Sequence, residues 1–171
     1  AEPPRVLRLA AATGEIMWQA GEGILTQSAL TSVAVGLLLE TNQLQLDDEI
    51  QTYVPAFPKK QWPVTLRQLM GHLAGLTNDG GDEGPLLSTR CERTVDGLQY
   101  FAERSLLFEP GTQYRYSSYG WILVSAAVEA AADEPFLSFM RRQILEPLGM
   151  DHTEADSATD PIRDRATFYF P

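Results

Sequence analysis

The sequence contains one cysteine, Cys91, and two histidines, His72 and His152. A single cysteine excludes an intrachain disulfide, and because no histidine flanks it we expect a structural rather than a nucleophilic thiol. The two histidines are far apart and match no metal-ligand spacing such as H-E-x-x-H, so no metal site is expected. There is no G-x-S-x-G motif, and His72 is expected to make a structural hydrogen bond rather than to act as the base of a Ser-His-Asp triad.

Positive charge is also scarce, with 13 Lys and Arg against 23 Asp and Glu and a formal net charge of −10. A nucleic-acid partner is therefore not expected, since phosphate binding requires a concentrated basic surface. No apolar run approaches the roughly 20 residues that span a bilayer, and the N-terminal AEPPRVLRLA lacks the basic-then-apolar order of a signal peptide. We expect a soluble protein, with its compartment and oligomeric state left open.

The length and composition of the sequence are those of one globular domain. It has 171 residues, of which 44% are hydrophobic and 21% are charged. Two β-prone runs separated by a Thr-Gly turn predict a hairpin over residues 6–19. The apolar pattern predicts a buried helix over residues 28–41, in which Gly36 is expected to be closely packed, and a short helix with Thr65 as its N-cap. Further helices are predicted over residues 94–105, over residues 120–132, and from residue 134 to a stop at Pro147 and Gly149.

A small polar cluster, TQS, leads directly into the apolar helix over residues 28–41. Several hydrolases present a nucleophilic serine in this way, which makes Ser28 the best candidate for acylation and Thr26 the next. A serine hydroxyl needs a neighbouring base or cation to become a nucleophile. No lysine lies one helical turn after Ser28, and Lys59 and Lys60 belong to a different loop.

The segment RYSSYG, residues 115–120, is the second feature that bears on chemistry. Tyr114, Tyr116 and Tyr119 cluster immediately before a predicted buried helix. A tyrosine hydroxyl has an intrinsic pKa of about 10 and acts as a base at neutral pH only where cations favour the phenolate. Taken alone, these tyrosines are expected to pack and anchor the loop; together with a serine at a helix start they favour a catalytic site.

Four segments, in this order, resemble the serine β-lactamase-like and penicillin-binding-protein-like hydrolases of the class C type, and most closely the LACTB-like branch. They are SALTSVAVGLLLETNQLQLDDEIQTYVPAFP, VTLRQLMGHLAGL, FEPGTQYRYSSYGWILV and ILEPLGMDHTEAD. Together they cover residues 28–155. The resemblance implies a mixed α/β (α+β) fold of the β-lactamase/transpeptidase type, in which an antiparallel sheet is flanked by helices and joined to a largely helical domain.

The resemblance also implies a function for individual residues. Tyr116 falls on the family's catalytic tyrosine, which helps to activate the nucleophile and protonates the leaving group. Ser118 falls where many members have asparagine, and His72 falls on a structural position. The implied reaction is acyl transfer through an acyl-enzyme, without metal or cofactor, on small-molecule ester, amide, D-amino peptide or β-lactam substrates.

The sequence departs from the family at the nucleophile. The family expects Ser-x-x-Lys. With one residue deleted, Thr26 of TQSALT aligns with the nucleophile and the lysine is missing; without a gap, Leu25 aligns with the nucleophile and Ser28 with the lysine. Neither alignment keeps both parts, so the catalytic apparatus is expected to be incomplete.

The family's third motif, a Lys/His-x-Gly on a sheet strand, would lie beyond Pro171. Residues 1–171 are therefore expected to form a single but partial β-lactamase-like domain. Its expected parts are a sheet-edge hairpin (1–23), a helix-rich region (24–155) and a return towards the sheet (156–171). Two functions follow as hypotheses: a serine acyl hydrolase, or a non-catalytic binding or assembly module that keeps the fold.

Overall fold

A computed structural model describes residues 28–78 and 91–153, and every structural statement below refers to these ranges. The predicted hairpin over residues 6–19 and the return over residues 156–171 lie outside them. Within them the only β pairing is an antiparallel bridge between Glu49 and Thr65. The helical elements, in chain order, are α2 (Ser28–Glu40), η1 (Ile50–Thr52), α3 (Leu66–Met70), η2 (Thr94–Tyr100), α5 (Ser118–Ala132), α6 (Phe136–Met140) and η3 (Arg141–Leu145).

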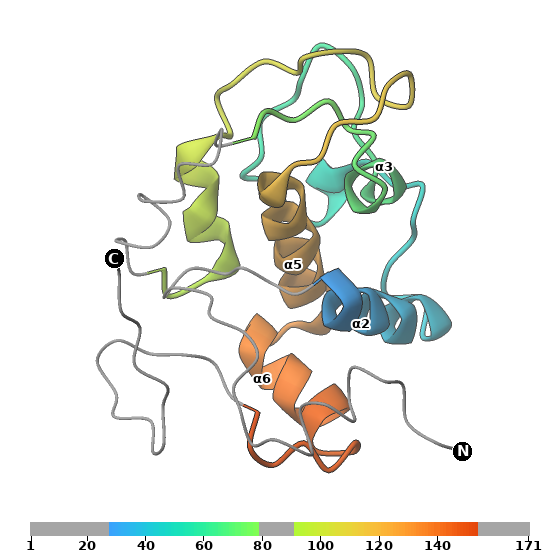
Figure 1. Ribbon diagram of the computed structural model, residues 1–171, viewed down its shortest axis with the longest axis vertical. Helices are drawn as coiled ribbons and strands as arrows, with labels where there is room; N and C mark the ends of the chain where they lie inside the picture. Colours follow the sequence, from blue (N-terminus) through green and yellow to red (C-terminus); the bar gives the residue numbers. More distant parts are fainter. Residues whose placement is uncertain (1–27, 79–90, 154–171) are drawn as a thin grey trace, which may run out of the picture.

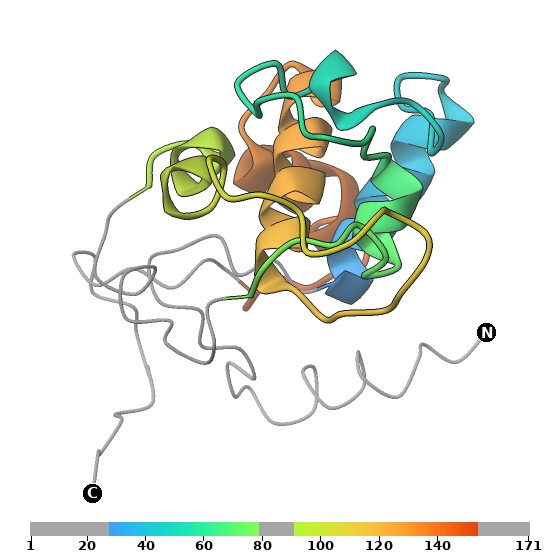
Figure 2. The ribbon, with the colours of Figure 1, turned by 90° about the horizontal axis from the view of Figure 1, so that it is seen from above.

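Helix α5 lies at the centre of the described structure, with η2 on one side, α3 and α2 on the other, and α6 following at its end (Figures 1 and 2). Every residue of α5 from Ser118 to Glu129 is buried, because its sequence is apolar on all faces. Its position confirms the buried helix predicted over residues 120–132, which begins two residues earlier than expected. No described helix is long and apolar enough to cross a bilayer.

Helix α2 packs against α5 and α6 and confirms the helix predicted over residues 28–41. Its buried side chains, Ala34, Val35 and Leu38, contribute to one hydrophobic core. The expectation that Gly36 is closely packed is wrong. A Cβ built at Gly36 meets no described atom within 4 Å, because Gly36 is only partly buried.

Helix α3 begins at the predicted N-cap. The Thr65 hydroxyl accepts a hydrogen bond from the Gln68 backbone N–H (3.3 Å), and the Gln68 side chain accepts one from the Thr65 N–H (2.9 Å). This capping box satisfies two amides that the first helical turn leaves unpaired. The helix ends at Gly71, the first of the two glycines, Gly71 and Gly75, at which the sequence allows it to end.

The helix predicted over residues 94–105 is wrong in type and length, since η2 is a 3₁₀ helix that ends at Tyr100. The residues after it face another loop. The Lys60 ammonium donates hydrogen bonds to the carbonyls of Ala102 and Arg104, and these tertiary bonds replace further helical turns.

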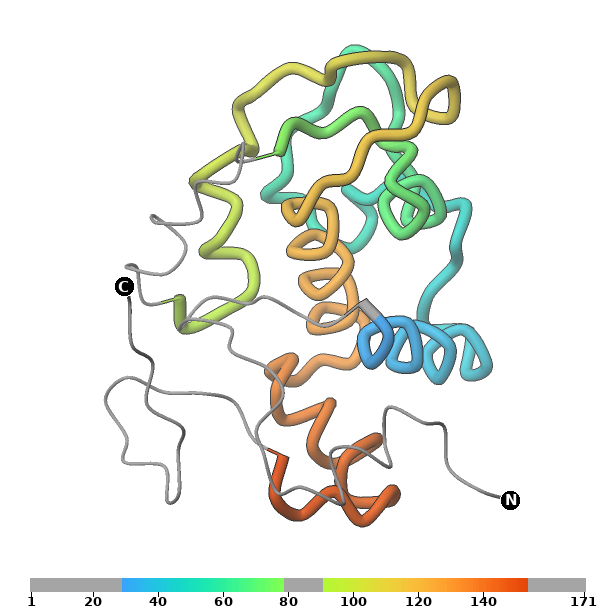
Figure 3. Tube along the Cα trace, viewed as in Figure 1, coloured from blue at the N-terminus to red at the C-terminus, as the bar shows by residue number. Residues whose placement is uncertain are grey.

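The last predicted helix is present, but it changes type part-way along. Helix α6 ends at Met140, and the chain continues as a single π-type turn, η3 (Figure 3). The Glu146 N–H donates to the Arg141 carbonyl at 2.9 Å, five residues back. Pro147, which has no N–H and clashes with a preceding helical carbonyl, prevents a regular continuation.

Candidate active site

Two chain segments, residues 72–78 and residues 107–118, lie side by side and form the scaffold of the candidate site. The first follows α3 and the second leads into α5. Three backbone hydrogen bonds join them, each from an N–H of the second segment to a carbonyl of the first: Leu107 to Gly75 (2.8 Å), Gly111 to Leu73 (2.8 Å) and Arg115 to His72 (2.9 Å).

Gly75 permits the close approach of the two segments. Its φ is +72°, a backbone conformation that residues other than glycine rarely adopt. A Cβ at this position would lie 2.6 Å from the carbonyl oxygen of Phe108. The glycine of the HLAGL segment is therefore required by the backbone itself.

Two further hydrogen bonds connect residues 72–78 to the first turn of α5. The Ser117 hydroxyl donates to the Thr77 carbonyl (2.9 Å), and the Asn78 side-chain oxygen accepts from the Ser118 N–H (3.2 Å). The first amides of a helix have no partner within it, so Asn78 caps α5 from a distant segment. The sequence carries no local signal for this contact, because Asn78 and Ser118 are 40 residues apart.

Tyr116 and Ser118, both predicted from the sequence, lie two residues apart at the start of α5 but differ in accessibility. Tyr116 is 54% exposed, whereas Ser118 is 7% exposed. A small molecule can therefore reach the ring of Tyr116, while the Ser118 side chain is buried in the scaffold. Among the described residues no ion pair or cation–ring contact involves Tyr116.

His72 contacts the same segment through its ring. The Ser117 N–H points at its Nδ1 (3.3 Å) and the indole Nε1–H of Trp121 at its Nε2 (3.4 Å). The ring lies 4.7 Å from that of Tyr116 between centroids and 5.9 Å from that of Tyr114. Burial lowers the pKa of His72, which favours the neutral form. These contacts agree with the structural hydrogen bond predicted for this histidine.

Ser28 is the first residue of α2, a helix that packs against α5. Thr31 lies three residues after Ser28, the spacing that separates the serine from the lysine in Ser-x-x-Lys. Its side chain is fully buried, and its hydroxyl oxygen has no hydrogen-bond partner among the described residues. Thr26 and Leu25 lie outside the described residues.

Lys60, from the loop before α3, is engaged in contacts of its own. The Lys60 ammonium donates to the carbonyls of Ala102 and Arg104 and lies 4.9 Å from the ring centroid of Phe57. Burial lowers the pKa of Lys60, partly offset by the charge of Glu103. This lysine therefore anchors a loop rather than serving Ser28.

Other reactive groups do not form a second site in the described part of the chain. It contains no group of three or more His, Cys, Asp or Glu side chains that could hold a metal ion. Cys91 is partly buried, and burial together with the nearby Asp96 carboxylate raises the pKa of its thiol. Because the thiolate is the nucleophilic form, Cys91 is poorly suited to attack.

Comparison with known families decides the affiliation. The family model described as Beta-lactamase matches residues 29–169. The chain belongs to the β-lactamase family. Members of this family are serine acyl hydrolases, and the match starts one residue after Ser28.

Individual relatives agree with this family. The human mitochondrial protein "Serine beta-lactamase-like protein LACTB" is 26% identical over 209 residues, covering 82% of this chain and 38% of that protein. The chain thus spans about two fifths of that relative's length. Among solved structures, a penicillin-binding protein from Bacillus halodurans has a TM-score of 0.71 at 22% identity, covering 81% of this chain and 44% of that one. EstCE1, described as a hydrolase with promiscuous acyltransferase activity, has a TM-score of 0.61 at 27% identity, covering 74% and 37%.

The structural neighbours have the β-lactamase and penicillin-binding-protein fold, in agreement with an α/β architecture. The described residues hold the helical part of that architecture. The segments from which an antiparallel sheet is expected, residues 1–23 and 156–171, lie outside the described residues, and the Glu49–Thr65 bridge is isolated.

Proposed function

We propose that this β-lactamase-family protein hydrolyses small esters, amides, peptides or β-lactams through an acyl-enzyme formed on Ser28, with Tyr116 moving the proton. One observation carries the proposal. Tyr116, on the family's tyrosine position, is exposed to solvent while the backbone on both sides of it is held by residues 72–78. An accessible phenol on a fixed backbone is suited to proton transfer at a bound substrate.

The proposed reaction has two steps, acylation of Ser28 and hydrolysis of the acyl-enzyme. The Ser28 oxygen attacks the substrate carbonyl carbon, and its proton passes to the oxygen of Tyr116 as the phenol passes its own proton to the carbonyl oxygen, which takes the electron pair. When the carbonyl re-forms, its proton returns to Tyr116, the phenol gives a proton to the leaving group, and the bond to the leaving group breaks. Water then attacks the acyl-enzyme ester and releases Ser28, the same phenol carrying the proton.

The test is an intact-mass measurement of the 171-residue chain before and after incubation with excess penicillin or an activated phenyl ester. A stoichiometric adduct that maps to the Ser28 peptide and is absent from Ser28→Ala supports the proposal. Ser138→Ala is the matched control, since Ser138 is an exposed serine on α6. An adduct that persists in Ser28→Ala, or no adduct in the parent chain, overturns it.

A second function, a non-catalytic binding or assembly module with the same fold, is favoured by the lack of a lysine one helical turn after Ser28. Thr31, a fully buried neutral side chain, stands there instead. The Lys60 ammonium is hydrogen-bonded to the carbonyls of Ala102 and Arg104. The same measurement separates the two functions. Retained folding with no acylation by either reagent supports the module, and acylation of Ser28 excludes it.

A further inference from the structure

His72 adopts a backbone conformation that directs its ring at the tyrosine segment. It directly follows Gly71, the C-cap of α3, and has a φ of +58°. Non-glycine residues adopt this left-handed region rarely, at a cost in free energy that the surrounding contacts must offset. The contacts that do so are the hydrogen bond that its ring accepts and the packing of Tyr116 against it.

The hydrogen bonds of the imidazole impose a protonation state. Both ring nitrogens of His72 face N–H donors, Ser117 N–H at Nδ1 and Trp121 Nε1–H at Nε2. A neutral imidazole has one nitrogen with a free lone pair, so each tautomer accepts one of these bonds. An imidazolium has no free lone pair and would set N–H against N–H on both sides.

Among the described residues, no charged side chain that would favour the imidazolium faces the ring of His72. The groups that face its ring are the phenols of Tyr114 and Tyr116 from residues 107–118 and the indole of Trp121 from α5. On α3 itself, the Arg67 guanidinium is paired with the Asp47 carboxylate at 2.7 Å. Burial is the cause of the lowered pKa, and no charged side chain in the described ranges contributes to it.

We propose that neutral His72 is a positioning residue for Tyr116. Its Nδ1 holds the Ser117 N–H, the next amide along the chain, while its ring supports the ring of Tyr116 at 4.7 Å. These two contacts fix the backbone after Tyr116 and one face of the phenol. The carbonyl of His72 fixes the backbone before it, through the Arg115 N–H at 2.9 Å.

One consequence is a defined pH response. When a proton binds the free lone pair of His72, the hydrogen bond from Ser117 or Trp121 breaks and no other tautomer can restore it. The Tyr116–Ser117 segment then loses its acceptor at the ring. The assignment of Tyr116 to catalysis rests on the proposed function, whereas the coupling of Tyr116 to the charge of His72 does not.

The experiment is an NMR titration of the full chain between pH 5 and 8. It follows the imidazole nitrogens of His72, the Ser117 amide and the ring of Tyr116, with exposed His152 as the internal reference. We expect the Ser117 and Tyr116 signals to shift with the midpoint of His72. Signals that stay flat while His72 titrates, or that follow the midpoint of His152, overturn the proposal.

Two variants sharpen the test. Asparagine tolerates a positive φ, and its side-chain oxygen can accept from the Ser117 N–H, so His72→Asn keeps that bond without a titrating group. Glycine tolerates the same φ but offers no acceptor and no ring. We expect His72→Asn to keep the Ser117 amide at its pH 8 position throughout the titration, and His72→Gly to displace it at every pH. Equal displacement in both variants contradicts the positioning role.

Kinetics separate this proposal from the proposed function. If Ser28 is acylated, His72→Gly should slow acylation by roughly 10- to 100-fold, as expected for a misplaced catalytic group, and His72→Asn, which keeps the acceptor for Ser117 but loses the ring, should slow it less. An equal loss in both variants counts against positioning. If the parent chain is not acylated, the proposed function fails, and the NMR titration still decides whether His72 positions Tyr116.

Discussion

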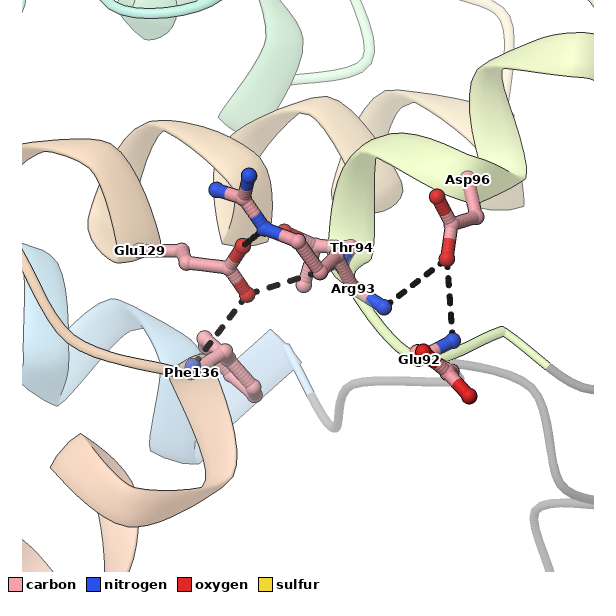
Figure 4. Close-up of polar contacts among 6 residues, drawn as sticks. All are labelled: Glu92, Arg93, Thr94, Asp96, Glu129 and Phe136. Atoms are coloured by element: carbon pink, nitrogen blue, oxygen red, sulfur yellow. Dashed lines mark hydrogen bonds and ion pairs between the residues drawn. The ribbon is translucent and has the colours of Figure 1, made fainter.

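The carboxylate of Glu129 accepts a hydrogen bond from the backbone N–H of Phe136 at 3.3 Å, joining the end of α5 to the start of α6 (Figure 4). The same carboxylate accepts from the Arg93 guanidinium at 3.0 Å and, more weakly, from the Thr94 N–H at 3.5 Å. Glu129 is 6% exposed. A buried charge is tolerated only where it is paired and hydrogen-bonded, so this residue ties α5 to the beginnings of both η2 and α6.

Replacing Glu129 is therefore expected to destabilise the fold. Glu129→Ala leaves the amides of Thr94 and Phe136 without an acceptor and should lower the free energy of unfolding by about 3 kcal/mol in urea denaturation. Glu129→Gln keeps one acceptor oxygen and should cost about 1–2 kcal/mol. Glu92→Gln is the control, because Glu92 is exposed and engages Asp96 through its backbone N–H. Equal effects at Glu92 and Glu129 would refute this account.

Replacing Gly75 or Gly36 by alanine should change the stability of the protein in opposite directions. Gly75→Ala places a Cβ against the Phe108 carbonyl at a positive φ and should cost about 2 kcal/mol or more. Gly36→Ala adds a Cβ in open space within α2 and should stabilise the protein by about 0.5–1 kcal/mol. Paired thermal melts measure both changes, and a loss of stability at Gly36 would show that a neighbour fills that space.

Thr31, one helical turn after Ser28, predicts a gain in stability on removal of its hydroxyl. This buried hydroxyl has no hydrogen-bond partner among the described residues, so the nearly isosteric Thr31→Val should raise the free energy of unfolding by about 1 kcal/mol. Thr41→Val is the matched control, since the exposed Thr41 hydroxyl donates to the Leu37 carbonyl at 3.1 Å and to the Gln43 side chain at 2.8 Å. A destabilising Thr31→Val would mean that the hydroxyl has a partner after all.

The features that could be predicted from the sequence are those set by neighbouring residues. The capping box of Thr65 and Gln68 joins groups three residues apart, and the unbroken apolar run of α5 predicts its burial. Tyr116 is a candidate because a linear motif surrounds it, and its catalytic role stays a prediction. Local signals of this kind survive folding because tertiary contacts do not compete with them.

The remainder depends on contacts between distant residues. The early end of η2 depends on Lys60, which is 42 residues from Ala102, and the α5 cap depends on Asn78, 40 residues from Ser118. The contact between His72 and Tyr116 is of the same kind. A motif can indicate that both residues matter, but only the fold shows that their rings touch.

Removing the hydroxyl of Tyr116 should slow the reaction without changing the stability of the fold. If the proposed function holds, Tyr116→Phe should slow acylation by roughly 10²–10⁴-fold, the usual contribution of a general acid–base group. The melting temperature of the Tyr116→Phe variant should equal that of the parent protein, because the Tyr116 side chain is half exposed. Tyr114→Phe is the control, since Tyr114 lies two residues earlier and is also exposed. Similar rates for the two variants would remove Tyr116 from the mechanism.

The lowered pKa of His72 predicts a stability that depends on pH. Burial holds the folded-state pKa below the ordinary 6.5, so the unfolded chain binds more protons in the interval between the two values. Stability should therefore be fully present above about pH 6.5 and decline as the pH falls through the interval towards the folded pKa. Urea denaturation at a series of pH values measures this decline. In His72→Asn it should disappear, while His152→Asn, which changes the exposed histidine, should retain it. A decline that persists in His72→Asn would assign the pH dependence to carboxylates instead.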